Sequence, residues 1–410
     1  MKTKWKMLAF LCAIFAVYTV DRAMLGPLAL SVQKDVGIDD IQFGVLNAAV
    51  FWAYAAFVPV AGFLGDRYDR SLLIGGATVL WSAMMVFAGF AGGFWSLLLL
   101  VSVAVTVPQT VYSPAAAALI SDMHKDTRGT AMAVHQGAFY SGYLVSGAVA
   151  AAFLMAFGSW RTAYWTMGAA GLLLGVAFLR FRKWLPSVRE TERPRSAPSF
   201  SEAAKAFFGC PTAVLGALGH VAFTFAAFGY CSWGPKFVAL KCGVAPETAG
   251  TGVMLFHFAP ALAAVLAAGA AANALTGRFP RFRLAVQSVS LIAAAPVLFW
   301  FGYSGSVCSA WASAAIFGVL KGAFEANSVN SIFDVVAPRY RASAMGYLNV
   351  LSGVLGSTAP LVLGWLSQTR GVTGLSFGFG AFGAALAVAA ALGAIALFFT
   401  FNADRRRVLQ

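Results

Sequence analysis

The sequence predicts an all-α membrane protein in which twelve transmembrane helices form two pseudo-symmetric six-helix bundles. Hydrophobic residues make up 60% of the 410 residues and charged residues only 11%, whereas soluble domains carry roughly 25% charged residues. Apolar runs long enough to cross a bilayer recur along the whole chain. Short motifs in the first half return in the second half, which indicates two parallel copies of one unit.

Twelve apolar segments are expected to cross the membrane. The first follows a basic N-terminus and resembles a signal peptide, but its apolar run continues without a small-residue cleavage site, so we expect it to be retained. The segments lie near residues 7–33, 41–64, 71–93, 96–121, 129–156, 163–182, 209–238, 246–271, 283–303, 308–334, 341–368 and 375–401.

The basic residues predict the orientation of these segments. With the N-terminus in the cytoplasm, 22 of the 29 Lys and Arg residues fall on the cytoplasmic side and 5 on the other, while Arg22 and Lys321 remain within the membrane. The positive-inside rule therefore predicts a multi-pass protein of the cell (inner) membrane with both termini in the cytoplasm. The same rule explains the net charge of +14 without a nucleic-acid partner.

The longest polar stretch divides the twelve segments six and six. It is rich in charged residues, Pro and Ser, which is typical of a linker. We therefore expect an N-terminal six-helix bundle over residues 1–182, a cytoplasmic linker over residues 183–208 and a C-terminal six-helix bundle over residues 209–410.

Two loops of the first half have counterparts in the second. GFLGDRYDRSLL, after the second segment, aligns with NALTGRFPRFRL after the eighth and places Arg70 on Arg281. SDMHKDTRGTAMAV, after the fourth segment, aligns with FDVVAPRYRASAMGY after the tenth and places Arg128 on Arg341. Repeats related by an axis along the membrane normal are expected to form a binding site between the halves near the bilayer midplane.

The GFLGDRYDRSLL loop resembles the signature between helices two and three of the major facilitator superfamily, and the resemblance extends over the whole chain. It implies the major facilitator fold and a transporter, not an enzyme. In that superfamily, charged residues at cytoplasmic helix ends form a network that closes the inner side. The corresponding cytoplasmic-gate residues here are Gly62, Asp66, Arg67, Arg70, Asp122, Arg128 and Arg341.

Two branches of the superfamily fit the sequence. YTVDRAMLGPLALSVQKDVGIDDIQFGVLNAAVFWAYA is similar to the start of anion:cation symporters. Spinster-like transporters share the Asp-Arg pair, the Asp-Arg-Tyr-x-Arg loop and a segment resembling SPAAAALISD. In Spinster-like proteins a glutamate on helix four belongs to the proton switch, whereas this chain has Gln109 there. The two resemblances imply a small organic anion or a lysolipid as substrate.

The first segment carries Asp21 and Arg22 in its apolar run, where each charge costs at least ~2.5–3.5 kcal/mol on insertion scales. Adjacent residues on a helix point 100° apart, so the two side chains cannot meet the same neighbour. We expect Arg22 to bind a substrate carboxylate and Asp21 to couple protons, with Tyr18 hydrogen-bonded to either. The alternative is a structural ion pair that holds helices together.

The tenth segment carries a second set of polar residues. Lys321 and Glu325 are spaced i, i+4 and share one helix face. We expect Lys321 to bind an anionic group and Glu325 to couple protons; a self-neutralising buried pair is the alternative. Asn327 is a further candidate for substrate binding. Gln109 maps beside Lys321 through the repeat and is expected to line the same cavity.

These observations predict a secondary active transporter that moves a small organic anion, a carboxylate or a sugar acid, together with protons by alternating access. Spinster-like transport of an amphipathic lipid is the first alternative, and a non-transporting membrane sensor is the second. No phosphate loop, Ser-His-Asp set or metal-ligand cluster occurs, so we expect no enzymatic activity, cofactor or metal. The expected partners are the substrate, protons and the bilayer, and we expect a monomer.

Overall fold

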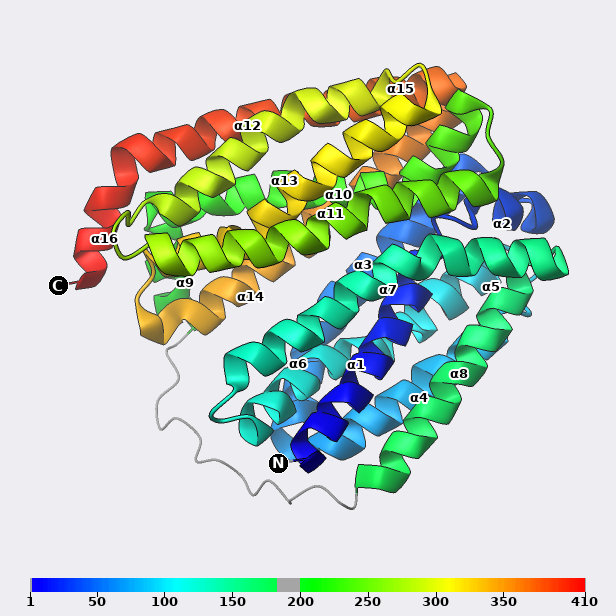
Figure 1. The fold of residues 1–410 in the computed structure, drawn as a ribbon, viewed down its shortest axis with the longest axis horizontal. Helices are drawn as coiled ribbons and strands as arrows, with labels where there is room; N and C mark the ends of the chain where they lie inside the picture. Colours follow the sequence, from blue (N-terminus) through cyan, green and yellow to red (C-terminus); the bar gives the residue numbers. More distant parts are fainter. Residues whose placement is uncertain (1, 183–199, 410) are drawn as a thin grey trace. The chain divides into compact units, whose positions relative to one another are not determined.

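The computed structural model describes residues 2–182 and 200–409, and these residues form helices joined by short turns (Figure 1). They contain ten regions that are long and apolar enough to cross a membrane. The last region, Ser343–Val408, is 66 residues long, enough for two crossings. Counting these two crossings and α1 (Lys2–Ala23), the described residues provide the twelve crossings predicted from the sequence.

The helices of the first half begin and end at recognisable signals. Asp39 caps the third helix in a capping box with Gln42, and Asp69 caps the fourth by accepting from the Leu72 N–H. After α1, the elements are α2 (Ala29–Val36), α3 (Asp40–Arg67), α4 (Arg70–Ala88), α5 (Phe94–Leu97), the π-helix η1 (Leu98–Ala104), α6 (Thr106–Met123), α7 (Arg128–Phe157) and α8 (Trp160–Phe181).

The described part of the second half begins at residue 200. Its elements are α9 (Phe200–Phe208), α10 (Pro211–Cys242), α11 (Pro246–Leu275), α12 (Phe282–Gly302), α13 (Val307–Phe333), the 3-10 helix η3 (Pro338–Tyr340), α14 (Arg341–Leu351), the π-helix η4 (Ser352–Gly356), α15 (Ala359–Ile395), the π-helix η5 (Ala396–Thr400) and α16 (Phe401–Leu409).

Two details refine the expected boundaries. Residues 183–199 of the predicted linker lie outside the described residues, whereas residues 200–208 form α9, whose Phe207 is buried in a core with Cys210 and Leu348. The last two predicted segments are joined within α15 at Gly371, whose φ of 57° is left-handed. A glycine therefore makes the turn between the last two crossings.

The chain forms two compact units. One contains Met1–Thr191 together with Cys231–Leu255, and the other contains Glu192–Tyr230 together with Phe256–Gln410. The end of α10 and the start of α11 therefore pack with the first half of the chain. The division at residues 182 and 208 remains a prediction from the sequence.

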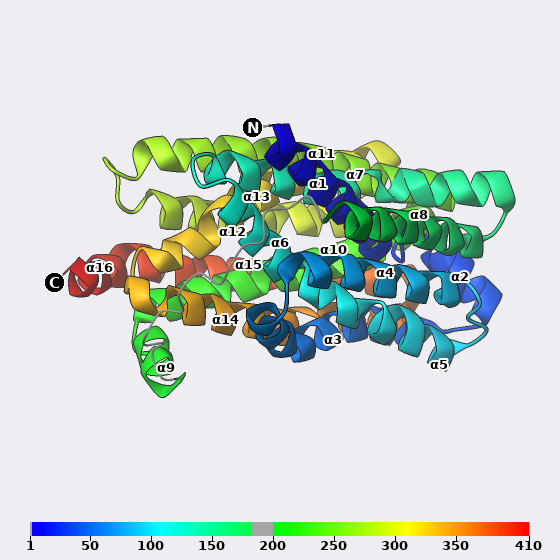
Figure 2. The ribbon, with the colours of Figure 1, turned by 90° about the horizontal axis from the view of Figure 1, so that it is seen from below.

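Small residues allow close packing inside the first unit. α4 and α8 lie side by side (Figures 1 and 2), and a Cβ added at Gly171 of α8 would lie 2.2 Å from Ser82 Oγ of α4. A Cβ added at Gly142 of α7 would lie 1.7 Å from Thr19 Oγ1 of α1. Such contacts are typical of helices that associate within a bilayer.

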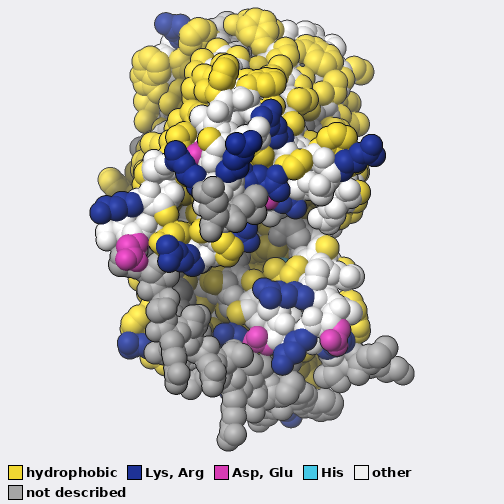
Figure 3. Space-filling view, turned by 90° about the vertical axis from the view of Figure 1, so that its left-hand side faces the viewer, with side chains coloured by type: hydrophobic (Ala, Val, Ile, Leu, Met, Phe, Trp, Pro, Cys, Tyr) yellow, Lys and Arg dark blue, Asp and Glu magenta, His cyan; other side chains and the backbone are white. Residues whose placement is uncertain are grey.

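The surface has the character of a membrane protein. Figure 3 shows Lys and Arg side chains gathered where helices end, beside a mainly hydrophobic side surface. Large apolar side chains such as Trp95, Leu173 and Phe399 are 74–80% exposed. A soluble protein rarely exposes apolar surface on this scale, so the surface supports a multi-pass membrane protein.

Candidate functional site

Arg22 lies near the end of α1, beside hydroxyl and aromatic groups. Its Nη1 donates a hydrogen bond to Tyr18 Oη at 3.2 Å. Its guanidinium carbon lies 4.8 Å from the ring centre of Phe51 and 5.0 Å from that of Tyr54, both on α3. Among the described residues, no carboxylate forms an ion pair with Arg22. This arginine is therefore a cation within the membrane span that has no acidic partner among the residues that the structure describes.

Asp21 occupies a different environment. It is 5% exposed, and neither carboxylate oxygen has a hydrogen-bond partner among the described residues. Its polar neighbours are Trp81 of α4 and Tyr164 of α8. Trp81 Nε1 and Tyr164 Oη also have no partner of good hydrogen-bond geometry among the described residues. Asp21 therefore faces a buried group of polar atoms inside the bundle, whereas Arg22 faces α3.

An aromatic cluster packs beside Tyr18. The rings of Tyr18 and Tyr112 stack with centres 5.9 Å apart, and Tyr112 Oη donates to the Leu11 carbonyl at 2.7 Å. Tyr112 Oη also lies 3.0 Å from His135 Nε2. Gln109, one turn before Tyr112 on α6, is 1% exposed, and its Nε2 has no partner among the described residues.

The second unit contains the Lys321–Glu325 pair on α13. Lys321 Nζ lies 2.7 Å from Glu325 Oε1, with side-chain exposures of 7% and 38%. Lys321 Nζ also lies 5.3 Å from the ring centre of Phe258 on α11. The pair is thus buried at its cationic end and open at its acidic end.

Two histidines lie near this pair. His220 Nδ1 of α10 is 3.1 Å from Ser328 Oγ, and His220 lies within electrostatic range of Glu325. His257 of α11 is fully buried near Lys321, and neither of its ring nitrogens has a partner of good geometry among the described residues. No motif near either histidine in the sequence associates it with α13.

Asn327, also on α13, is fully buried. Its Nδ2 donates to the Ala323 carbonyl at 2.9 Å, while its Oδ1 has no partner among the described residues. One polar atom of this amide is therefore engaged by the helix backbone, and the other is unsatisfied.

The predicted gate residues form local networks at helix ends. Arg70, at the start of α4, pairs with Asp122 at the end of α6. In the second unit, Arg283 Nη1 lies 2.8 Å from Asp334 Oδ1 and joins α12 to the end of α13 in the same way. The contact equivalent to Arg70–Asp122 is thus made by Arg283, two positions after the Arg281 that the sequence alignment selected.

Arg341 and Arg281 have other partners. Arg341 Nη2 donates to the Phe333 carbonyl at 2.9 Å, which ties α14 to the end of α13. Arg281 Nε donates to Asn402 Oδ1 at 3.1 Å.

Burial raises the pKa of Asp334 above its usual range, and nearby Arg283 offsets only part of this effect.

The other gate positions differ in how they are held. The guanidinium carbon of Arg67 lies 3.9 Å from the ring centre of Phe63, and Arg128 is exposed. Gly62 and Asp66 lie outside the residues whose side chains are described.

Asp69, which follows these residues in the chain, has a lowered pKa. Burial alone would raise the pKa of Asp69. Hydrogen bonds from Ser71 and the Leu72 N–H, together with Arg182, outweigh burial and lower that pKa.

A polar cluster that the sequence did not predict lies in the first unit. Lys236 of α10 donates to Gln33 Oε1 of α2 at 2.7 Å and also pairs with Asp40 of α3. Gln33 Nε2 donates to Asp40 Oδ1 at 2.7 Å, which closes the cluster. Lys236 lies 203 positions from Gln33 and 196 from Asp40 in the chain, so no local motif could have associated it with them.

A sequence model described as the Major Facilitator Superfamily matches residues 11–360. The chain belongs to the major facilitator superfamily. Its fold and its relatives are those of transporters, which agrees with the charged loops and the two half-repeats described above.

Two named proteins are similar to this chain in sequence. Protein spinster homolog 1 of Homo sapiens is 27% identical over 384 residues, which cover 88% of this chain and 72% of that protein. The "Probable galactarate/D-glucarate transporter GudP" of Bacillus subtilis (strain 168) is 27% identical over 210 residues, which cover 50% of this chain and 44% of that protein.

Solved structures show the same fold. The crystal structure of a bacterial homologue of the human lysosomal transporter Spinster, inward-facing and unoccupied, superimposes with a TM-score of 0.84 at 22% identity and covers 98% of both chains. The nucleoside transporter NupG (D323A mutant) superimposes with a TM-score of 0.78 at 13% identity and covers 96% of this chain and 99% of that chain.

Proposed function

We propose that this transporter imports a small organic anion, a carboxylate or a sugar acid, together with protons by alternating access. The observation that carries the proposal is Arg22, a cation within the membrane span that has no acidic partner among the described residues. An intramembrane charge of this kind marks a substrate or ion pathway more often than a structural pair.

The surroundings of Arg22 suit a carboxylate ligand. A guanidinium presents paired N–H donors that match a carboxylate in a bidentate arrangement. Phe51 and Tyr54 cover its face, and Tyr18 takes one donor. The remaining donors are available to an anion, whose charge would compensate the cost of the buried cation. Gln109 Nε2, which has no partner among the described residues, is proposed to add a hydrogen bond to this anion. Asn327 of the second unit, whose Oδ1 also has no partner among the described residues, is proposed separately as a substrate-binding residue.

Asp21 is the proposed proton carrier of the first half. An ionised carboxylate that is buried without hydrogen bonds costs several kcal/mol, so the neutral form suits the environment found here. Loss of its proton would place a negative charge one residue from Arg22 and compete with the bound anion. This coupling gives Asp21 a functional role that a structural salt bridge would not have.

Lys321 and Glu325 are the proposed counterparts in the second half. With Glu325 ionised, its carboxylate neutralises Lys321 at 2.7 Å. Protonation of Glu325 would release Lys321 for an anionic group of the substrate. The more exposed position of Glu325 gives its proton a route to water, whereas Lys321 remains buried.

The cytoplasmic gate and the orientation complete the proposal. The Arg70–Asp122 pair, with Gly62, Asp66, Arg67, Arg128 and Arg341 near it in the chain or its repeat, is proposed to stabilise closure on the cytoplasmic side. We also propose that both termini lie in the cytoplasm, that the protein resides in the inner membrane and that it acts as a monomer.

A second candidate is transport of an amphipathic lipid. It is favoured by the match to protein spinster homolog 1, which extends over 88% of this chain, whereas the match to the galactarate/D-glucarate transporter extends over 50%. A sensor that binds without transporting is the remaining alternative.

A ligand screen followed by a flux assay distinguishes these functions. Purified protein is tested by thermal shift against carboxylates, sugar acids and lysolipids, and each stabilising ligand is then tested for uptake in proteoliposomes with an inward proton gradient. Stabilisation and gradient-driven uptake of an organic anion support the proposal. A response to lysolipids alone supports the second candidate, and binding without flux supports a sensor.

A further inference from the structure

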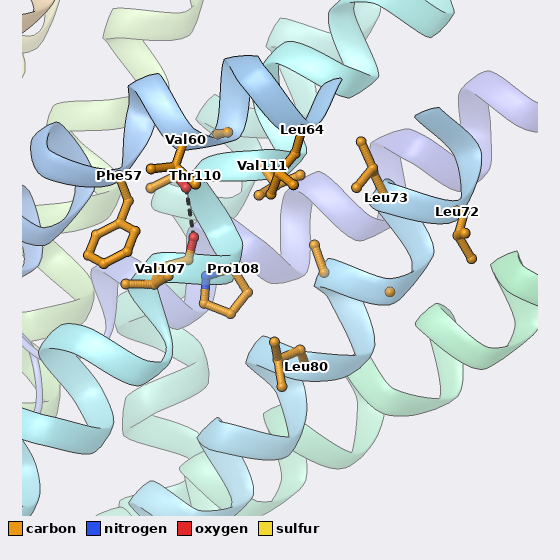
Figure 4. Close-up of a pocket in the computed structure, with 13 residues that line it drawn as sticks. Phe57, Val60, Leu64, Leu72, Leu73, Leu80, Val107, Pro108, Thr110 and Val111 are labelled. Atoms are coloured by element: carbon orange, nitrogen blue, oxygen red, sulfur yellow. Dashed lines mark hydrogen bonds between the residues drawn. The ribbon is translucent and has the colours of Figure 1, made fainter. Parts of the chain in front are cut away.

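An apolar groove lies between α3, α4 and α6 in the first unit. It has a volume of about 280 Å³, and its larger lining residues include Val60, Leu64, Leu72, Leu80 and Thr110 (Figure 4). Gly76, Ala77 and Ala61 are too small to fill the space between the larger side chains. The groove is therefore a consequence of small residues on facing helices.

The lining offers no unsatisfied polar side chain to a ligand. Thr110 carries the only polar side chain of the lining residues, and its hydroxyl donates to the Val107 carbonyl at 2.7 Å (Figure 4). A polar metabolite would lose its hydration here without gaining hydrogen bonds. The occupant must therefore be apolar along the whole length of the groove.

The groove is open along one side, where large apolar side chains are exposed. Val60, Leu72 and Leu80 are 42–52% exposed. Leu72 and Leu80 lie within a region of α4 that is long and apolar enough to cross a membrane, and Val60 lies just after such a region of α3. From Leu72 to Leu80, a rise of 1.5 Å per residue gives a length of about 12 Å. One leaflet of a hydrocarbon core ~30 Å thick measures about 15 Å. The groove thus spans most of one leaflet, which is the depth of a single acyl chain.

A cation lies at the end of the groove that is predicted to face the cytoplasm. Arg67 is the last residue of α3, three positions after the groove residue Leu64, so the two lie on neighbouring positions of the helix surface. Its guanidinium is stacked on Phe63, which is 51% exposed. An arginine at this level attracts the phosphate of an anionic lipid, and the exposed Tyr68 beside it is typical of a membrane interface.

We propose that this groove binds one acyl chain of an anionic phospholipid from the leaflet on the predicted cytoplasmic side, with the lipid phosphate at Arg67. The site is separate from the residues proposed for substrate and protons, because none of them lines it. Its occupant is a lipid that stays bound at the protein surface during transport.

Gly76 provides a direct test of occupancy. A Cβ added at Gly76 meets no heavy atom within 4 Å, so the backbone there accepts a side chain, and Gly76→Leu is designed to occupy the groove. Gly269→Leu on α11 is the matched control, because a Cβ there also meets nothing within 4 Å. Arg67→Gln removes the proposed headgroup contact and leaves the groove open.

The full-length variants are titrated with dioleoyl-phosphatidylglycerol or dioleoyl-phosphatidylcholine and examined by native mass spectrometry. We expect the unmodified protein and Gly269→Leu to bind the first phosphatidylglycerol at least fivefold more tightly than phosphatidylcholine. Gly76→Leu should weaken binding of both lipids at least fivefold, and Arg67→Gln should abolish only the preference between them.

Unchanged lipid binding by folded Gly76→Leu would overturn the groove as the site, and an unchanged preference in Arg67→Gln would overturn the headgroup contact. Folding is checked by size-exclusion chromatography and thermal unfolding. If Gly76→Leu does not fold, Val60→Trp fills the same groove from α3 and is held to the same outcome.

Discussion

Asp21 and Arg22 are adjacent in the chain, yet their side chains lie against different helices. Arg22 reaches Tyr18 and the rings of α3, whereas Asp21 is buried next to Trp81 of α4 and Tyr164 of α8. The two charges therefore do not satisfy each other, and this separation underlies the distinct roles proposed for them.

Replacement of Arg22 tests its role in binding. Arg22→Lys retains the charge but loses the planar fork. Loss of one charge-assisted hydrogen bond worth ~1.5–3 kcal/mol should raise the KM for uptake about 10-fold or more. Arg22→Ala should abolish uptake. Counterflow in proteoliposomes measures both, with Arg180→Lys on the exposed surface of α8 as the control; an unaltered KM in Arg22→Lys would remove this residue from the site.

Replacement of Asp21 tests its role in coupling. Asp21→Asn mimics the protonated acid permanently and keeps its size, so exchange of substrate across the membrane should continue. Accumulation driven by a proton gradient should fall to the level of an uncoupled carrier. Asp126→Asn, which changes an exposed carboxylate in a loop, should leave both activities at their normal levels. Normal gradient-driven accumulation by Asp21→Asn would show that another group carries the proton.

The Lys236 cluster predicts strong coupling between distant parts of the sequence. The Lys236 side chain is 8% exposed and the Asp40 side chain is 18% exposed. Removing one partner of a buried pair typically costs about 3–5 kcal/mol, because the other charge is left uncompensated. Lys236→Met should therefore lower the thermal unfolding temperature more than the Lys236→Met/Asp40→Asn double variant does. Additive effects in this double-mutant cycle would mean that the two side chains are not coupled.

The pKa of Asp69 predicts a pH dependence of stability. Its folded-state pKa lies below the usual value of about 3.9, so the ionised form stabilises the folded protein. This contribution is fully present above about pH 4 and is lost as the pH falls through the folded-state pKa. Asp69→Asn should be less stable than the unmodified protein by a constant amount from pH 8 to about pH 5, and the two should converge below pH 4. A difference that persists unchanged to pH 3 would exclude this effect of charge.

The fold could be predicted from the sequence because each membrane crossing needs its own apolar run, which is visible in the sequence. Composition, the charged loops and the half-repeats thus predicted the helical membrane fold, which is confirmed. The i, i+4 spacing also predicted that Lys321 and Glu325 would meet, because both lie on one helix. The separate directions of Asp21 and Arg22 followed from helix geometry in the same way.

Contacts between helices were not accessible to the same reasoning. Nothing near Asp21 in the chain points to Trp81 or Tyr164, and nothing near Gln33 points to Lys236, because these contacts depend on how helices pack. The loop alignment similarly matched Arg70 with Arg281, whereas the ion pair that corresponds to Arg70–Asp122 is made between Arg283 and Asp334. A shift of two residues changes which side of a helix faces its neighbour, and loop motifs do not determine that register.

Proton-driven accumulation of an anion tests the central claim most directly. Proteoliposomes that contain the unmodified protein are given an inward proton gradient, and uptake of the organic anion that stabilises the protein best is compared with uptake after a protonophore. We predict accumulation above the external concentration that collapses with the protonophore and is absent in Arg22→Ala. Equal uptake with and without the gradient, or full uptake by Arg22→Ala, would contradict proton-coupled anion transport.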